Sequence, residues 1–423
     1  MTPPDTAAFA TLAVAPTLSP AERDRRWKGL RAVMSGRGID AILVGSFMGR
    51  ESLESYLIDD YLDAIVLLPV ASEPVVLTFS PSRLSRMYES ERSGHGGWVS
   101  DFRIGGGGAK AAALLEEKGL AQGRIGLVGF GPTAPGEMEG LLPLGFHKNL
   151  LAQLPNADIV DFTRDYTDFI LVKSDEEIAL LRYAAAVSEK ACLAMIEAAR
   201  PGASEAEVYA EIMRAIHRHG CSTRYPYLSL QSGPDNIGWG VPRWTVRAEP
   251  PRILARGDMV QAEIHTLYGG QEGQVQMAVA LDPLHADLMR CEAVAREAYE
   301  AGVAAVRPGV TFESVVRAME APIAKAGCWS KTPLLHTLTF GSTGFTAANR
   351  GQIAGTREGR IEGQMTPGIR RGDLVLQEGM GLELEPNACL GNRRVNIGGG
   401  VLVTARGAEE LNRISTRVHH IAA

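Results

Sequence analysis

Hydrophobic residues in the first 165 positions follow two alternating patterns. Between Glu22 and Gly38 they recur at helical spacing, and the glycines at 36 and 38 end this segment. Compact apolar runs bounded by glycine or proline follow at residues 39–44, 64–68, 74–79 and 125–128. Short β-branched runs that alternate with helical segments are typical of a buried sheet covered by helices. The pattern therefore predicts an α/β unit over residues 20–165.

A second region begins with a strong helix-start signal. Ser174 and Glu177 have the spacing of a capping box, in which the serine hydroxyl accepts a hydrogen bond from a backbone amide in the first turn of the helix. The segment that follows is rich in Ala, Leu and Glu and ends at residues 200–202, Arg-Pro-Gly. We therefore predict two domains, over residues 1–170 and 171–423.

The second region repeats itself once. Arg-Pro-Gly at residues 200–202 recurs at 307–309, and each copy is followed by a hydroxyl residue suited to cap a helix. A Gly-Asp pair that opens an apolar run comes after each copy, at residues 257–258 and 372–373. The repeats predict a pseudo-two-fold domain. We expect its functional site between the two halves, because facing strands direct their side chains to one place there.

Composition narrows the classes of function. The 423 residues exceed one ordinary domain core, and 45% hydrophobic with 22% charged residues is typical of globular proteins. A net charge of −6 without a basic run argues against nucleic acid as a partner. No apolar run reaches the roughly 18–20 residues that a membrane span needs. Five scattered cysteines without a CxxC pair, and a start that lacks a secretory signal pattern, predict a cytoplasmic protein.

Several motifs between residues 165 and 410 resemble those of the creatinase/prolidase/methionine aminopeptidase family, M24. The similarity is clearest at residues 171–178, at both Arg-Pro-Gly turns, at Glu383-Leu384-Glu385-Pro386 and at residues 400–404. Residues 20–165 resemble the smaller amino-terminal domain of the creatinase and prolidase branch. The resemblance implies a pita-bread α/β fold and a homodimer. In such dimers the amino-terminal domain reaches the neighbouring subunit's site, which makes Arg50 and His95 candidates for that role.

The resemblance also implies where metal ligands would lie. Peptidases of this family hold two metal ions with two aspartates, one histidine and two glutamates. In this sequence those positions fall on or near Glu263, Gln274, Phe340, Glu385 and Gly398. Because Gln, Phe and Gly supply no anionic oxygen or imidazole for two divalent cations, we do not expect the standard dinuclear site.

Creatinase is the member of the family that works without a metal, through a histidine and glutamates. The segment in which its active-site histidine should lie, residues 232–240, contains no histidine here. Its two glutamates fall on Gln276 and Glu385. By resemblance, the chain is therefore neither a standard peptidase nor a standard creatinase.

The residues themselves place several polar side chains in one cleft. Alternate strand side chains share a face, so each of three segments presents a polar set to one side. These sets are Glu263 with His265, Glu272 with Gln274 and Gln276, and Glu383 with Glu385. Crowded carboxylates cannot all ionise without a cation, which is a proton, a metal ion or a basic group of the substrate.

Two arrangements satisfy this requirement. In the first, which we favour, no cofactor is bound and His265 is a general acid–base catalyst oriented by a carboxylate, while other carboxylates bind a cationic small molecule. In the second, one divalent cation is bound, and Mn, Fe or Zn suit the donor types. Its ligands would be Glu263, His265, Glu383 and Glu385.

Four side chains outside these sets are further candidates. Trp239 either stacks on a cationic substrate or packs in the core. Arg243 and Arg350 are candidates to bind a substrate carboxylate, although surface arginines are common. His336, in an apolar run, is either a structural histidine or a site residue.

We therefore predict a homodimeric hydrolase that cleaves a C–N bond of a small polar or zwitterionic nitrogen metabolite. His265 moves the proton, and Glu263 and Glu385 orient groups or activate water. The predicted substrate-binding residues are Glu383, Glu272, Gln274, Gln276, Trp239, Arg243 and His336. The alternatives are a metal-dependent lyase of the dimethylsulfoniopropionate-lyase type, an Xaa-Pro peptidase-like metalloenzyme and a non-catalytic binding domain.

Overall fold

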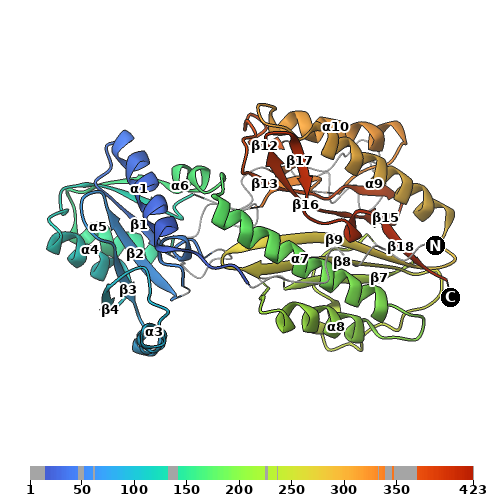
Figure 1. The fold of residues 1–423 in the computed structure, drawn as a ribbon, viewed down its shortest axis with the longest axis horizontal. Coiled ribbons are helices and arrows are strands. Elements are labelled where there is room, and N and C mark those ends of the chain that lie inside the picture. Colours follow the sequence, from blue (N-terminus) through green and yellow to red (C-terminus); the bar gives the residue numbers. More distant parts are fainter. Residues whose placement is uncertain are drawn as a thin grey trace. The chain divides into compact units, whose positions relative to one another are not determined.

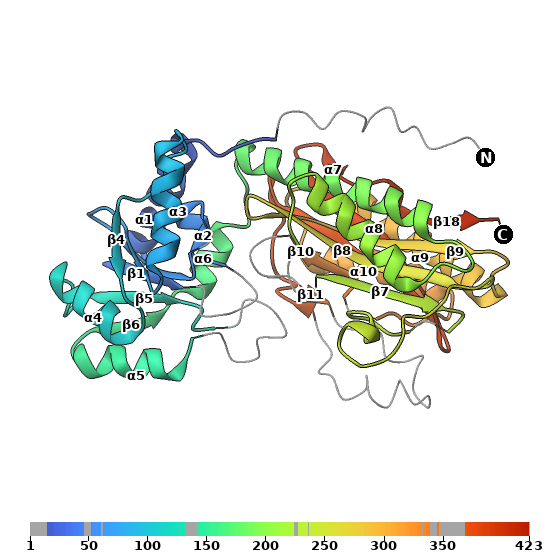
Figure 2. The same cartoon turned by 90° about the horizontal axis from the view of Figure 1, so that it is seen from below.

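The structure is a computed structural model with two compact units (Figures 1 and 2). It describes residues 15–45, 52–60, 62–131, 142–223, 227–235, 237–331, 333–338, 345–346 and 369–422. One unit comprises Thr17–Ile170, and the other contains the described residues from Leu171 onward together with Ala15 and Pro16. No helix within these ranges combines the length and the apolar character that crossing a membrane requires.

The first unit is a six-stranded sheet covered by helices. Its strand order is β4-β3-β2-β1-β5-β6, with β1 antiparallel to β2 and parallel to β5. In chain order its elements are α1 (Pro20–Gly36), β1 (Ala41–Gly45), α2 (Ser55–Ile58), β2 (Ala64–Pro69), β3 (Val75–Thr78), α3 (Pro81–Arg92), β4 (Asp101–Ile104), α4 (Gly108–Glu117), β5 (Arg124–Val128), α5 (Leu144–Gln153), β6 (Asp158–Asp161) and α6 (Thr163–Phe169).

The central strands of this unit are apolar at every position because both faces of the sheet are covered. Ile42 and Val44 of β1 enter one apolar core, whereas Ala41 and Leu43 enter a second core on the other face. A strand buried on both faces has no polar side to expose. The predicted α/β unit is therefore confirmed, with β1, β2, β3 and β5 in the predicted runs; the edge strands β4 and β6 were not predicted.

The second unit contains an eight-stranded sheet. Six of its strands follow the order β10-β13-β16-β9-β8-β7, while β17 pairs with β16 and β18 pairs with β9. Its elements are α7 (Asp175–Ala198), α8 (Glu205–Arg218), β7 (Leu228–Gly233), η3 (Arg243–Thr245), β8 (Met259–Tyr268), β9 (Gln271–Leu281), α9 (Ala286–Ala305), α10 (Phe312–Lys325), β10 (Leu335–Thr337), β11 (Phe345–Thr346), β12 (Ile369–Arg370), β13 (Gly381–Leu384), β14 (Asn387–Leu390), β15 (Arg393–Asn396), β16 (Gly398–Thr404), β17 (Gly407–Glu410), η4 (Ile414–Thr416) and β18 (Val418–Ile421).

Each half of the second unit has its own apolar core. Residues of α7 and α8 pack with those of β7, β8 and β9, whereas residues of α9 and α10 pack mainly with those of β10, β13 and β16. Figure 1 shows the two helix pairs, green in the first half and orange in the second, along the one sheet. The apolar faces of the strands are thus turned to the helices, which leaves the opposite faces for polar side chains.

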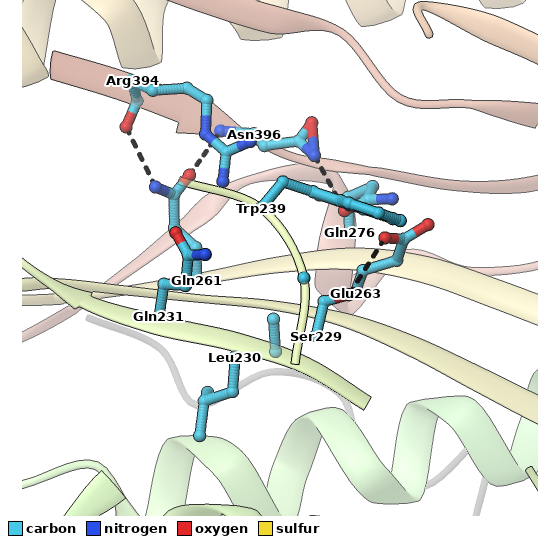
Figure 3. A pocket seen from close by; sticks show the side chains of 11 residues that line it. Ser229, Leu230, Gln231, Trp239, Gln261, Glu263, Gln276, Arg394 and Asn396 are labelled. Carbon is cyan, nitrogen blue, oxygen red and sulfur yellow. Dashed lines mark hydrogen bonds between the residues drawn. The ribbon is translucent and has the colours of Figure 1, made fainter. Parts of the chain in front are cut away.

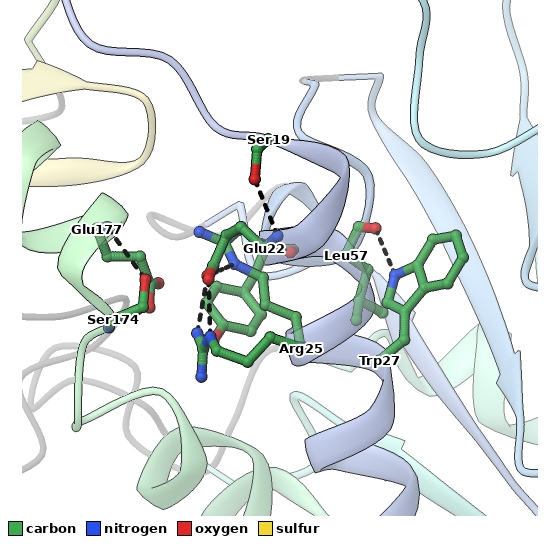
Figure 4. Close-up of polar contacts among 9 residues, drawn as sticks. Ser19, Glu22, Arg25, Trp27, Leu57, Ser174 and Glu177 are labelled. Carbon is green, nitrogen blue, oxygen red and sulfur yellow. Dashed lines mark hydrogen bonds and ion pairs between the residues drawn. The ribbon is translucent and has the colours of Figure 1, made fainter.

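Helix starts follow the predicted caps. The Ser174 hydroxyl accepts a hydrogen bond from the Glu177 amide at 3.2 Å, and the Glu177 carboxylate accepts one from the Ser174 amide at 3.0 Å (Figure 4). Ser204 caps α8 and Thr311 caps α10, as the repeat predicts. Ser19 caps α1 by the same kind of bond (Figure 4). These local bonds satisfy amides that have no partner within the helix.

The two repeats are related by backbone hydrogen bonds at their turns. The Gly202 amide donates to the Leu254 carbonyl, and the Gly309 amide donates to the Leu376 carbonyl, both at 2.9 Å. Leu254 and Leu376, 122 residues apart, are therefore equivalent. The prediction that both Gly-Asp pairs open equivalent strands was wrong: one pair follows Leu254, whereas the other precedes Leu376 within the turn at residues 371–373. Backbone pairing sets the register, and a dipeptide match does not determine it.

Candidate functional site

His265, on β8, lies between two carboxylates. Its Nδ1 donates to Glu272 Oε1 across the β8–β9 hairpin at 2.7 Å. Its Nε2 lies 3.5 Å from Glu263 Oε1 and has no hydrogen-bond partner in the described part of the chain. The side chain is 1% exposed. Because Glu272 holds the Nδ1 proton, Nε2 is the nitrogen left to take up or release a proton.

Glu263, two residues before His265, is held by neutral donors. Gln274 Nε2 donates to Glu263 Oε1 at 2.7 Å, and Ser229 Oγ lies 3.5 Å from Oε2. The amide of Gln274 therefore orients a carboxylate, although the sequence predicted it to bind substrate.

Glu385 and His336 form a second carboxylate–imidazole pair. His336 Nε2 lies 3.2 Å from Glu385 Oε1, and Gln276 Nε2 donates to Oε2. Burial raises the pKa of Glu385 to about 7, with His336 opposing this shift. Burial acts to lower the pKa of His336, but the contact with Glu385 outweighs it and raises that pKa. His336 thus contacts Glu385, a candidate site residue. This agrees with the second of the two alternatives for His336, a site residue rather than a structural histidine.

Glu383, on β13, is fully buried beside this pair. Its strand register places it opposite His336, and neither carboxyl oxygen has a hydrogen-bond partner among the described residues. Burial, reinforced by Glu385 and Glu263, raises the pKa of Glu383 well above its ordinary value. The cause of the shift is that burial without a hydrogen-bond partner favours the neutral acid over the carboxylate.

Arg394, on β15, is a cation in this region that the sequence analysis missed. It is 4% exposed, and burial lowers its pKa while nearby carboxylates oppose that shift. Arginine keeps its proton in proteins, so the guanidinium stays charged. The alternation of Arg394 and Asn396 along one short strand was the available signal.

A narrow pocket lies beside Glu263 and Arg394 (Figure 3), and its cavity volume of about 10 Å³ has room for about one water molecule. It is lined by Ser229, Leu230, Gln231, Trp239, Gly240, Gln261, Ala262, Glu263, Gln276, Arg394 and Asn396. The indole of Trp239 is 51% exposed, so this residue is not packed in the core. Among the residues that line the pocket, Glu263 and Arg394 alone are charged.

Other predicted residues lie elsewhere. Arg243, in η3, is exposed, pairs with Glu249 at 2.9 Å and is not among the residues that line the pocket. His95 is an exposed residue of the first unit. Arg50, Arg350 and Phe340 lie outside the described residues.

Equivalent positions of the two halves carry different side chains. His265 pairs with Gln274 in one hairpin and Asn387 pairs with Asn396 in the other, each pair shifted by 122 residues. The same shift relates Glu263 to Glu385, Glu272 to Arg394 and Gln261 to Glu383. Within the repeat, the counterpart of Gln274 is therefore Asn396, whereas the family resemblance places the last glutamate ligand near Gly398.

Comparison with known proteins identifies the family. Residues 179–405 match the Metallopeptidase family M24. The chain belongs to this family. It is 23% identical over 424 residues to the creatinase of Bacillus sp. strain B-0618, which covers 96% of this chain and 94% of the relative. It is 28% identical over 249 residues to the probable dipeptidase PepE of Mycobacterium tuberculosis, which covers 57% and 58%.

A solved structure supports the same fold. The Xaa-Pro dipeptidase from Bacillus anthracis matches with a TM-score of 0.72 at 17% identity, over 94% of this chain and all of the other. The predicted family and the predicted pita-bread fold are therefore confirmed. As an M24 member, the chain is hydrolase-like; neither its substrate nor its cofactor follows from the family alone.

The residues present do not fit the two-metal centre of the family's peptidases. The expected positions of two ligands carry Gln274 and Gly398, and neither residue supplies the negative charge that a pair of divalent ions requires. The Gln274 amide points its N–H at Glu263, and the Gln276 amide points its N–H at Glu385. Within the described residues, no group of three His, Cys, Asp or Glu side chains is arranged to hold a metal ion.

Proposed function

We propose that this protein hydrolyses a C–N bond of a small polar or zwitterionic nitrogen compound by acid–base chemistry of its own side chains. The observation that carries the proposal is the imidazole of His265 held between Glu272 and Glu263, with Glu263 on the wall of the pocket. The match to a creatinase over 96% of the chain supports this reaction class.

We assign a role to each group of the first half from its contacts. Glu263 faces the pocket and accepts a proton from the attacking water. That proton passes to His265 Nε2, 3.5 Å away, and Glu272 stabilises the imidazolium through Nδ1. Gln274 fixes the orientation of the Glu263 carboxylate. We therefore assign Glu272 and Gln274 to positioning rather than to substrate binding.

The second half supplies the group suited to protonate the leaving nitrogen. An acid works best near the pH at which the enzyme operates, and Glu385 has a pKa raised to about 7 by burial. His336 shares its proton, and Gln276, which lines the pocket, orients its carboxylate. The two carboxylate–imidazole systems thus supply a base and an acid to one region.

A substrate panel tests the proposal. The full chain is incubated with creatine, with ectoine, with Xaa-Pro dipeptides and with dimethylsulfoniopropionate, and the products are identified by mass spectrometry. Hydrolysis of a C–N bond in creatine, ectoine or a close analogue is the expected result. Cleavage of the dipeptides alone would establish a peptidase, and release of dimethylsulfide would establish a lyase. A chain that converts none of these compounds would favour the non-catalytic binding domain.

A further inference from the structure

The last strand, β18, continues the sheet of the second unit beyond the point where β16 ends its pairing (Figure 1). β16 pairs with β9 at Val275 and Gln276, whereas β18 pairs in parallel with the end of β9, over residues 278–281. Among the described strands, β18 pairs with β9 alone. A four-residue strand with one neighbour has few backbone hydrogen bonds, so its docking depends strongly on its side chains.

The side chains of β18 point alternately to the two faces of the sheet. Val418 joins the apolar core of the half that contains α9 and α10, and Ile421 packs against the core of the other half. Because alternate residues of a strand share a face, His420 lies on the side of Val418. Its side chain is 30% exposed there. The imidazole is therefore held by the protein and can still exchange a proton with solvent.

Both ring nitrogens of His420 contact a carboxylate. Nδ1 lies 3.1 and 3.2 Å from the two carboxyl oxygens of Asp282, which directly follows β9. Nε2 lies 3.2 and 3.1 Å from those of Glu292, on α9. A carboxylate only accepts hydrogen bonds, and a ring nitrogen donates one only when it carries a proton. Both contacts are therefore hydrogen bonds only in the doubly protonated imidazolium.

The two carboxylates favour this protonated form. Burial acts to lower the pKa of His420, but its hydrogen bonds to Asp282 and Glu292 outweigh that effect and raise the pKa. When the pH rises above the raised pKa, one ring nitrogen becomes an acceptor that faces the acceptors of a carboxylate. The two carboxylates then also lose the positive charge between them. The contact of β18 with its neighbours therefore changes from attraction to repulsion.

Two further charged groups beside this contact do not respond in the same way. On α9, Arg296 pairs with Glu300 at 2.7 Å, and an arginine keeps its charge at every pH used for proteins. On β18, the adjacent His419 belongs to the other face, and burial together with Arg417 lowers its pKa. His420 is therefore the group of this strand whose charge changes as the pH rises from acid to alkaline.

We propose that the imidazolium of His420 is a pH-sensitive clamp, which holds β18 to the end of β9 and to α9 while it is protonated and releases the strand when its proton is lost. Because the pKa is raised in the folded chain, the clamp contributes fully below the pKa of the unfolded chain and is lost as the pH rises through the raised value. The clamp is independent of the proposed hydrolysis, since it requires none of the site residues.

Amide hydrogen exchange of the full chain at pH 6 and pH 9 tests the clamp. Rates are corrected for the pH dependence of intrinsic exchange, and the amides of β8 report the stability of the sheet itself. The protection of residues 418–421 should fall about three- to tenfold more than that of β8, as expected for partly exposed ion pairs. An equal change in both strands would overturn the proposal.

Variants separate the imidazolium from the strand itself. His420→Gln removes the charge, so the protection of β18 should already be low at pH 6 and should no longer fall with pH. The double variant Asp282→Asn/Glu292→Gln removes the acceptor charges and should also abolish the pH dependence. His217→Gln, at an exposed position of α8, is the matched control and should keep the wild-type pattern. Circular dichroism confirms that each variant is folded. A wild-type pH dependence in folded His420→Gln would refute the clamp.

Nuclear magnetic resonance measures the proton of the clamp directly. The imidazole signals of His420 are assigned by their loss in His420→Gln and are followed against pH. The pKa of His420 should lie above that of a histidine in the unfolded chain, and it should fall in Asp282→Asn/Glu292→Gln. A pKa of His420 at or below the unfolded value would show that no imidazolium holds β18.

Discussion

The two halves of the second unit have one backbone plan but differ in the charge of equivalent side chains. In each, a hairpin pairs equivalent residues at a shift of 122 positions, and a glutamate stands at the same place, Glu263 or Glu385. The first half then carries Glu272 where the second carries Arg394. Symmetric strands therefore produce an asymmetric site. The backbone places equivalent side chains in one region, and the residue type at each position determines what that region can bind.

A second pair of equivalent positions, Gln261 and Glu383, also differs between the halves. Gln261 of the first half is fully hydrogen-bonded to the second hairpin, whereas its counterpart Glu383 is buried without a hydrogen bond in the described structure. A neutral amide thus stands beside Arg394, and a buried acid stands beside Glu385. Equivalent positions of the two halves thus differ both in charge and in hydrogen bonding.

The largest expected effect is on the imidazole of the first half. His265→Gln should lower kcat about 10²–10⁴-fold on any C–N substrate found, because the group that takes the proton from Glu263 is lost. Steady-state kinetics measure the change. His217→Gln, on an exposed position of α8, is the control and should have normal kinetics. A His265→Gln enzyme with wild-type kcat would show that the first half does not supply the base.

Making the halves alike in charge is the second test. Arg394→Glu gives the second hairpin the side chain of the first and adds a buried carboxylate to a cluster that already holds several. We expect the free energy of unfolding to fall by about 3–5 kcal/mol, as for other uncompensated buried charges. Urea denaturation measures it, with Arg406→Glu as the exposed control. Unchanged stability would mean that Arg394 does not balance the carboxylates.

Glu383 stands where the first half has the neutral Gln261, so we expect the free energy of unfolding to depend on pH through Glu383. The pKa of Glu383 is raised in the folded chain, so its contribution to stability is full below the pKa of the unfolded chain and is lost as pH rises toward the folded pKa. Glu383→Gln should reduce this loss by up to about 1.4 kcal/mol per pH unit.

Thermal unfolding near pH 5 and near pH 8 measures it. The variant should gain stability relative to wild type at the higher pH, and Glu378→Gln, on the surface, should show no such difference. A parallel pH dependence in wild type and Glu383→Gln would indicate that Glu383 is not held as a neutral acid.

The smallest expected effect concerns metal. Because Gln274 and Gly398 stand at two of the expected ligand positions, dialysis against EDTA should change kcat less than about twofold. The variant Gln274→Asp restores an acidic side chain at the first of these positions and should raise Mn or Zn content, measured by elemental analysis after loading. Loss of wild-type activity on dialysis that returns with added Mn or Zn would contradict a metal-free site.

Several features of the site could be predicted because they depend on local rules. Alternation along β8 places Glu263 and His265 on one face whatever the strand pairs with, and the hairpin to β9 brings Glu272 within reach. The partner of His336 could not be predicted in this way. Glu385, which holds it, lies 49 residues further along the chain, directly after β13, the neighbouring strand of the sheet.

By itself, the sequence determined the helix caps, the apolar strands, the family and the polar face of each strand. Neighbouring residues and their spacing decide those features. The tertiary structure alone decided that Arg394 enters the pocket, that Gln274 and Gln276 hold carboxylates and that the Gly-Asp pairs are not equivalent. Each of these depends on which strands pair and in which register, and pairing is set by backbone bonds and burial between segments far apart in the chain.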